Sequence, residues 1–188
     1  MSVYERELAS YRRLNEIAKK NGVVLFGSSF AKDIPVCELK QAFELDCDIY
    51  NRSFTDLSVF DAKELLDECV LKLAPHKVLL QMGETDLERG YHTIPEIVAE
   101  YEKAVNEIKK ADKHCDVIVV SVCDNGSGVY PEELNKQLEA MAGRCGCKYA
   151  DITPAFANES PTVKAFSMLK RFMRDRISFC DTVSMLNV

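Results

Sequence analysis

Short runs of consecutive apolar residues alternate along the chain with longer segments in which apolar residues recur every three or four positions. The apolar runs predict five strands, at 23–26, 47–50, 78–82, 117–122 and 148–152. The helical periodicity predicts helices over 4–20, 36–45, 58–73, 95–111, 131–142 and 163–173. Strands that are apolar throughout are typical of a parallel sheet covered on both faces. The pattern therefore predicts an α/β protein, a three-layer α/β/α sandwich with a five-stranded parallel sheet, in a single domain spanning residues 1–188.

A sheet of this kind also predicts where a site lies. Ligands of parallel α/β sheets bind just beyond the carboxyl ends of the strands. Five loops meet that condition, at 27–32, 51–55, 83–92, 123–130 and 153–160.

Composition and charge narrow the class of protein. The chain has 188 residues, 47% hydrophobic and 29% charged, with a net charge of -6, as in soluble globular proteins. It has no Lys/Arg-rich block, which argues against a nucleic-acid partner. The first 20 residues lack the apolar core of a signal peptide, and no apolar run approaches the ~18 residues of a membrane span. We therefore expect a cytoplasmic protein, with its oligomeric state left open.

The eight cysteines do not suggest a metal site or a disulfide framework. Cys145 and Cys147 form the only tight pair, and neither a second pair nor a histidine lies at zinc-finger spacing. Without a secretory signal, small buried thiols are the simpler interpretation. No metal is predicted.

Four short motifs carry the chemical information: "FGSSFA", "IYNRSF" and "LLQMGETDL" at the ends of the first three strands, and "FMRDRIS" near the C-terminus. In this order the set resembles the SGNH family of GDSL-type hydrolases. The resemblance implies a flavodoxin-like fold and an esterase or acylhydrolase that attacks a small ester with a serine and needs no cofactor.

The family roles transfer to individual residues, with several replacements. Ser29 stands at the position of the nucleophile. Ser53 replaces the glycine whose N–H faces the oxyanion, and Thr85 replaces the asparagine that also faces it. Asp175 and Ser178 occupy the places of the family's Asp-x-x-His, so the histidine base has become a serine.

The loss of that histidine leaves the activity open. A serine hydroxyl does not accept a proton near neutral pH, whereas imidazole titrates there. Of the three histidines, His76 and His114 are predicted at the amino end of the sheet. His92 follows the third strand on the correct edge and is the candidate substitute base. The alternatives are an esterase weakened by the missing base and a catalytically inactive SGNH-like domain, a pseudoenzyme that binds a ligand or partner.

Simpler roles also fit the same residues. Ser28 and Ser29 suit the cap of a helix after the first strand, and Asp175 suits a surface position between two arginines. An unrelated flavodoxin-like module is a further alternative, although the segment 28–32 is a poor match to a flavin phosphate loop.

Overall fold

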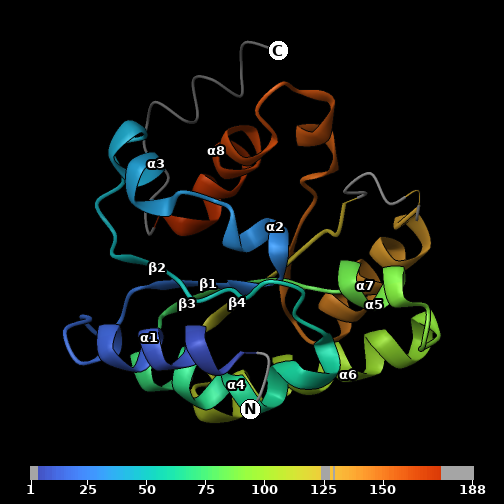
Figure 1. Ribbon diagram of the computed structural model, residues 1–188, viewed down its shortest axis with the longest axis horizontal. Coiled ribbons are helices and arrows are strands. Elements are labelled where there is room, and N and C mark those ends of the chain that lie inside the picture. Colours follow the sequence, from blue (N-terminus) through green and yellow to red (C-terminus); the bar gives the residue numbers. More distant parts are fainter. Residues whose placement is uncertain (1–3, 124–127, 129, 175–188) are drawn as a thin grey trace.

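A computed structural model describes residues 4–123, 128 and 130–174. At its centre is a sheet of five strands in the order β2-β1-β3-β4-β5 (Figure 1). The strands are β1 (Val23–Gly27), β2 (Ile49–Asn51), β3 (Lys77–Gln81), β4 (Asp116–Val120) and β5 (Lys148–Ala150). Every neighbouring pair is parallel, so the predicted five-stranded parallel sheet is confirmed.

Both faces of this sheet are covered. All residues of β1 and β3 are buried. Phe26 and Leu80 point into one hydrophobic core, and their neighbours Leu25 and Leu79 point into the other. Strands that are apolar at every position form because successive side chains alternate between two buried faces.

The helices form the outer two layers of the sandwich (Figure 1). One face packs against α1 (Glu5–Asn15), α4 (Val59–Cys69), the 3-10 segment η1 (Leu71–Leu73), α6 (Ile94–Ala111) and α7 (Glu132–Arg144). The other packs against α2 (Ser29–Lys32), α3 (Val36–Ala42), the 3-10 segment η2 (Thr153–Ala157) and α8 (Pro161–Met173). The predicted three-layer architecture is confirmed. Within the described ranges, no helix has the length and apolar character needed to cross a membrane.

Two short helices were not predicted from the apolar periodicity, although a helix capped by Ser28 or Ser29 was an alternative for the first of them. Helix α2 begins two residues after the end of β1, and α5 (Glu84–Arg89) begins three residues after the end of β3. Neither has enough turns to show an apolar period. The first helix is also shorter than predicted and ends at Asn15. The N–H groups of Glu16 and Ile17 bond three residues back instead of four, which tightens the last turn before the chain leaves the helix.

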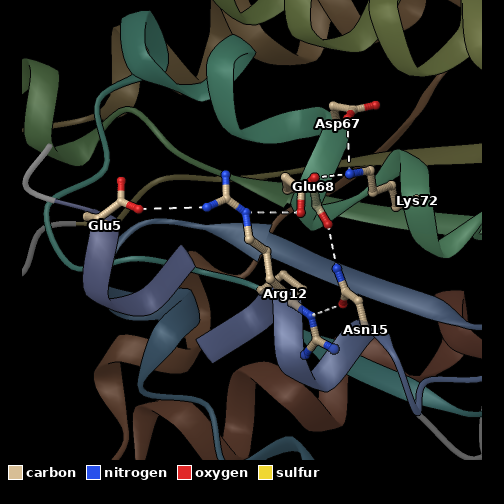
Figure 2. A network of polar contacts seen from close by, with 7 residues as sticks. Glu5, Arg12, Asn15, Asp67, Glu68 and Lys72 are labelled. Atoms are coloured by element: carbon tan, nitrogen blue, oxygen red, sulfur yellow. Dashed lines mark hydrogen bonds and ion pairs between the residues drawn. The ribbon is translucent and has the colours of Figure 1, made fainter. Parts of the chain in front are cut away.

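Polar contacts fasten α1 to α4 (Figure 2). Arg12 Nε on α1 lies 3.3 Å from Glu68 Oε2 on α4, and Glu68 also forms an ion pair with Lys72 of η1. Asn15 donates to the Glu68 carbonyl at 2.6 Å. Its own oxygen accepts from Arg52 Nε at 3.2 Å, so α1 is tied to the segment that follows β2.

Candidate active site

The three motifs that follow β1, β2 and β3 meet at one edge of the sheet. In the order β2-β1-β3-β4-β5 the chain changes direction across the sheet between β1 and β3. Crevices at such a switch point are the usual ligand sites of open α/β sheets. The topology therefore brings the first three predicted motifs to the expected place.

The first motif needs a glycine at its turn. A Cβ at Gly27 would lie 2.1 Å from the carbonyl oxygen of Gln81 on β3. The next residue, Ser28, donates its N–H to that same oxygen at 2.9 Å, which continues the strand pairing by one residue. Ser29 then opens α2, so the two serines stand at a strand-to-helix turn.

Burial separates the two serines. Ser28 is fully buried, and its hydroxyl lies 3.0 Å from Thr85 Oγ1. It occupies the N-cap position of α2 but makes no side-chain capping bond. Ser29 is half-buried and closer to solvent. Only Ser29 is placed to reach a molecule outside the protein.

A buried carboxyl group lies beneath this turn. Glu84 is 6% exposed and accepts a hydrogen bond from Gln81 Nε2 at 3.3 Å. Burial raises the pKa of Glu84 to about 7, against the opposing effect of nearby hydrogen-bond donors that include the Ser28 hydroxyl. The polar layer under the site therefore contains a carboxyl that titrates near neutral pH.

The second motif is turned toward the protein interior. Ser53 is fully buried, and its N–H donates to Asn51 Oδ1 at 3.1 Å. Asn51 in turn donates to the Ala31 carbonyl of α2 at 2.7 Å. These bonds hold the segment after β2 against α2, and they engage the Ser53 N–H, which the sequence motif predicts as an oxyanion donor.

Ser29 is hydrogen-bonded to a carboxylate. Its hydroxyl donates to Asp56 Oδ1 at 3.0 Å, and the Asp56 N–H donates back to Ser29 Oγ at 2.9 Å. Asp56 is exposed and has a positive φ of 52°. The pair joins the turn after β1 to the loop after β2.

The third motif supports a neighbouring helix. Asp86 accepts from the Ser58 hydroxyl at 2.5 Å and from the Val59 N–H at 2.9 Å. Ser58 also accepts from the Phe60 N–H at 3.2 Å, as the N-cap of α4. Asp86 therefore belongs to the start of α4, and Thr85 beside it faces Ser28.

The histidines lie as the topology predicts, at different ends of the sheet. His92 is exposed and stacks on Phe60, with ring centroids 3.8 Å apart. No hydrogen bond joins it to Ser29 in the part of the chain that the structure describes. The His76 N–H bonds to the Gly22 carbonyl, just before β1, so His76 is at the amino end. His114 precedes β4 at that same end.

Asp175 and Ser178 lie outside the described residues. Among those that are described, no group of three or more His, Cys, Asp and Glu side chains is placed to hold a metal ion.

Two residues at this edge were missed by sequence reasoning. The predicted loop at 51–55 stopped one residue before Asp56, and no pattern in the sequence pairs that residue with Ser29. Glu84 lay inside the third motif, but burial gives it its raised pKa, and burial is a property of the folded chain.

Sequence comparisons and structural comparisons give different results. No protein-family model matches the chain, and no curated protein matches it. Solved structures do match. A protein from Streptococcus pneumonia, described provisionally as a platelet activating factor, aligns with a TM-score of 0.77 at 16% identity, over 90% of this chain and 92% of its own.

Two further matches are described as ester-cleaving enzymes. A GDSL-like lipase from Bacteroides thetaiotaomicron gives a TM-score of 0.70 at 13% identity, over 87% of this chain and 93% of its own. A catalytic mutant of Axe2, an acetylxylan esterase from Geobacillus stearothermophilus, gives a TM-score of 0.62 at 17% identity, over 84% of this chain and 99% of its own. The predicted resemblance is thereby confirmed at the level of architecture: the chain has the flavodoxin-like fold of the SGNH (GDSL-type) hydrolases.

Proposed function

We propose that the chain is an SGNH-like esterase or acylhydrolase that cleaves a small ester with Ser29 as its nucleophile. The observation that carries the proposal is the placement of Ser29 at the carboxyl end of β1. Its hydroxyl lies beside the switch point of the sheet, while Ser28 is buried behind it. The GDSL-like lipase and the acetylxylan esterase with the same fold support ester chemistry.

The replaced residues predict a slow enzyme. Ser53 and Thr85 take the positions of the family's oxyanion donors, and Asp175 with Ser178 those of its acid and base. The Thr85 hydroxyl already bonds with Ser28. Loss of one oxyanion donor raises a barrier by about 3 kcal/mol, or roughly a hundredfold in rate. We expect turnover above background but below that of an intact triad.

The test is hydrolysis of p-nitrophenyl acetate by the wild type, Ser29→Ala and Ser167→Ala. Ser167 is a half-buried serine on α8, on another element, and serves as the matched control. Ser29→Ala is expected to lower kcat/KM at least tenfold, and Ser167→Ala to leave it unchanged. Equal rates for the wild type and Ser29→Ala contradict the proposal.

A second candidate is a domain that binds a ligand without turnover. It is favoured by the internal bonding of the oxyanion positions, because Ser53 donates its N–H to Asn51 and Thr85 bonds with Ser28. Introducing Ser178→His together with Thr85→Asn is expected to create esterase activity in such a domain. No gain in a folded double variant means that the site has diverged beyond the loss of its base.

A further inference from the structure

We propose that Asp56 accepts the proton of Ser29, in place of the family's histidine. The inference rests on the proposed ester hydrolysis. Its basis is the closed pair of hydrogen bonds in which Ser29 donates to Asp56 Oδ1 at 3.0 Å and receives the Asp56 N–H at 2.9 Å. A base must lie within hydrogen-bond reach of the proton it removes, and this carboxylate does.

The two bonds prepare the serine oxygen for attack. A hydroxyl has one proton and two lone pairs. In Ser29 the proton is directed at a carboxylate, and one lone pair receives the Asp56 N–H. The other lone pair is left for a carbonyl carbon. The N–H also stabilises the negative charge that grows on Oγ as the proton leaves.

Asp56 is held in position through its backbone. Its φ of 52° is a conformation that costs most side chains free energy, although Asp and Asn adopt it more readily than others. The Asp56 carbonyl accepts from the Tyr4 hydroxyl at 3.2 Å and from Arg89 at 3.5 Å. The carboxylate therefore faces Ser29 from a backbone anchored on two sides.

The chemical step balances without any further reagent. Ser29 Oγ bonds to the ester carbonyl carbon while its proton moves to Asp56 Oδ1. The tetrahedral intermediate then breaks its bond to the alcohol oxygen, which takes the proton from Asp56 and leaves. Water repeats the sequence on the acyl-enzyme, giving up its proton to Asp56, and the acid is released as Ser29 recovers its proton.

The charges around Asp56 are already engaged with other groups. Lys32 on α2 bonds to Glu7 at 2.9 Å and to Thr55 Oγ1 at 2.7 Å. Arg89 on α5 is directed at the Asp56 carbonyl. Tyr4, at the start of α1, also donates to Asp61 of α4 at 3.0 Å. The Asp56 carboxylate thus has Ser29 as its hydrogen-bonding partner within the described residues.

The same bonds also tie two loops together, so the test needs a readout that a purely structural role leaves unchanged. Removal of a general base lowers kcat and kcat/KM equally and leaves KM unchanged. Loosening of the two loops changes KM and the urea midpoint instead.

The first experiment compares Asp56→Asn with Asp33→Asn in p-nitrophenyl acetate hydrolysis, with Ser29→Ala as the background. Asparagine keeps the N–H donor and tolerates a positive φ. Asp33 is an exposed carboxylate at the C-cap of α2 and is the control. Asp56→Asn is expected to lower kcat/KM by about a hundredfold with an unchanged urea midpoint, since general bases contribute ~10²–10⁴. Turnover that depends on Ser29 but is unaffected by Asp56→Asn overturns the inference.

A second experiment separates this inference from the proposed function. In the reaction with a fluorophosphonate ester, Ser29 Oγ attacks the phosphorus and forms an Oγ–P bond. Fluoride leaves, and the serine proton passes to the base. Labelling of Ser29, measured by mass spectrometry, is expected to be faster in the wild type than in Asp56→Asn. Such labelling without ester turnover contradicts the esterase but supports Asp56. Equal labelling of the two proteins, or no labelling, overturns the role of Asp56.

Discussion

At the scale of single residues, the site depends on a turn that sends two adjacent serines in different directions. Ser28 continues the pairing of β1 with β3, and its hydroxyl meets Thr85 in the interior. Ser29 starts a helix, and its hydroxyl meets Asp56 near the surface. Consecutive residues at a strand-to-helix turn thereby take opposite environments. That difference supports the proposed role of Ser29 on physical grounds, in addition to the motif alignment.

The turn itself makes a stability prediction at Gly27. A Cβ there would lie 2.1 Å from the Gln81 carbonyl oxygen and 2.9 Å from the Ala31 Cβ. Because backbone of a central strand cannot move aside, Gly27→Ala is expected to lower the free energy of unfolding by about 3 kcal/mol or more. Urea denaturation followed by circular dichroism measures the change.

Gly143 provides the matched control for this substitution. It lies within α7, where a Cβ would meet nothing within 4 Å. Gly143→Ala is expected to leave the unfolding free energy unchanged or raise it by up to about 1 kcal/mol, because alanine favours helix. A Gly27→Ala protein as stable as the wild type would mean that β1 and β3 are not packed this closely.

The buried carboxyl of Glu84 predicts a pH dependence of stability. Its pKa is raised by burial from 4.5 to about 7, so between these values the folded protein binds more protons than the unfolded chain. Unfolding free energy therefore falls as pH rises from about 4.5 to about 7. Glu84→Gln removes this pH dependence. The unfolding free energy of the variant, relative to that of the wild type, is therefore expected to rise by on the order of 3 kcal/mol between pH 4.5 and pH 8.

Urea titrations of both proteins at intervals from pH 4.5 to pH 8 give this difference. Glu64→Gln, at an exposed position on α4, is the control and is expected to follow the wild type. A constant difference between Glu84→Gln and the wild type over the whole range would show that Glu84 ionises alike in the folded and unfolded states.

At the scale of elements, Asp86 connects α5 with the first turn of α4. It is 3% exposed and bonds with Ser58 and the Val59 N–H. Charged hydrogen bonds of this kind contribute about 1.5–3 kcal/mol, and their loss leaves a helix N–H without a partner. Asp86→Ala is expected to cost about 2–3 kcal/mol of unfolding free energy. Asp67→Ala, at an exposed position of α4, is expected to cost less than about 0.5 kcal/mol. Thermal or urea unfolding distinguishes the two, and equal losses would contradict a capping role for Asp86.

The helices and strands also show which parts of the fold could be predicted from the sequence. Strands β1, β3 and β4 were predictable because every residue had to face one of two cores. Helices α2 and α5 were not, since four and six residues give too little period to detect. The first three motifs could be placed at one edge by topology. Contacts such as Ser29–Asp56 and Ser28–Thr85 join residues 27 and 57 positions apart, and only the packed loops decide them.

At the scale of the whole molecule, the cysteines report whether the two cores unfold together. Cys69 and Cys115 belong to the core on the α4 and α6 side, and Cys123 to the core on the opposite face. Burial raises the pKa of each of these thiols to about 12, so both access and thiolate formation are suppressed in the folded protein. Cys37 is exposed.

Brief labelling with N-ethylmaleimide at increasing urea, followed by mass spectrometry, turns this difference into a test. Cys37 is expected to react without denaturant. Cys69 and Cys123 are expected to become reactive at the same urea concentration. The strands of one sheet contribute side chains to both cores, so unfolding of the sheet disrupts both cores together. Coincidence of these two midpoints with the loss of circular dichroism supports a single cooperative unit. Earlier labelling of Cys123 than of Cys69 would show that the face carrying α2, α3 and α8 opens before the rest.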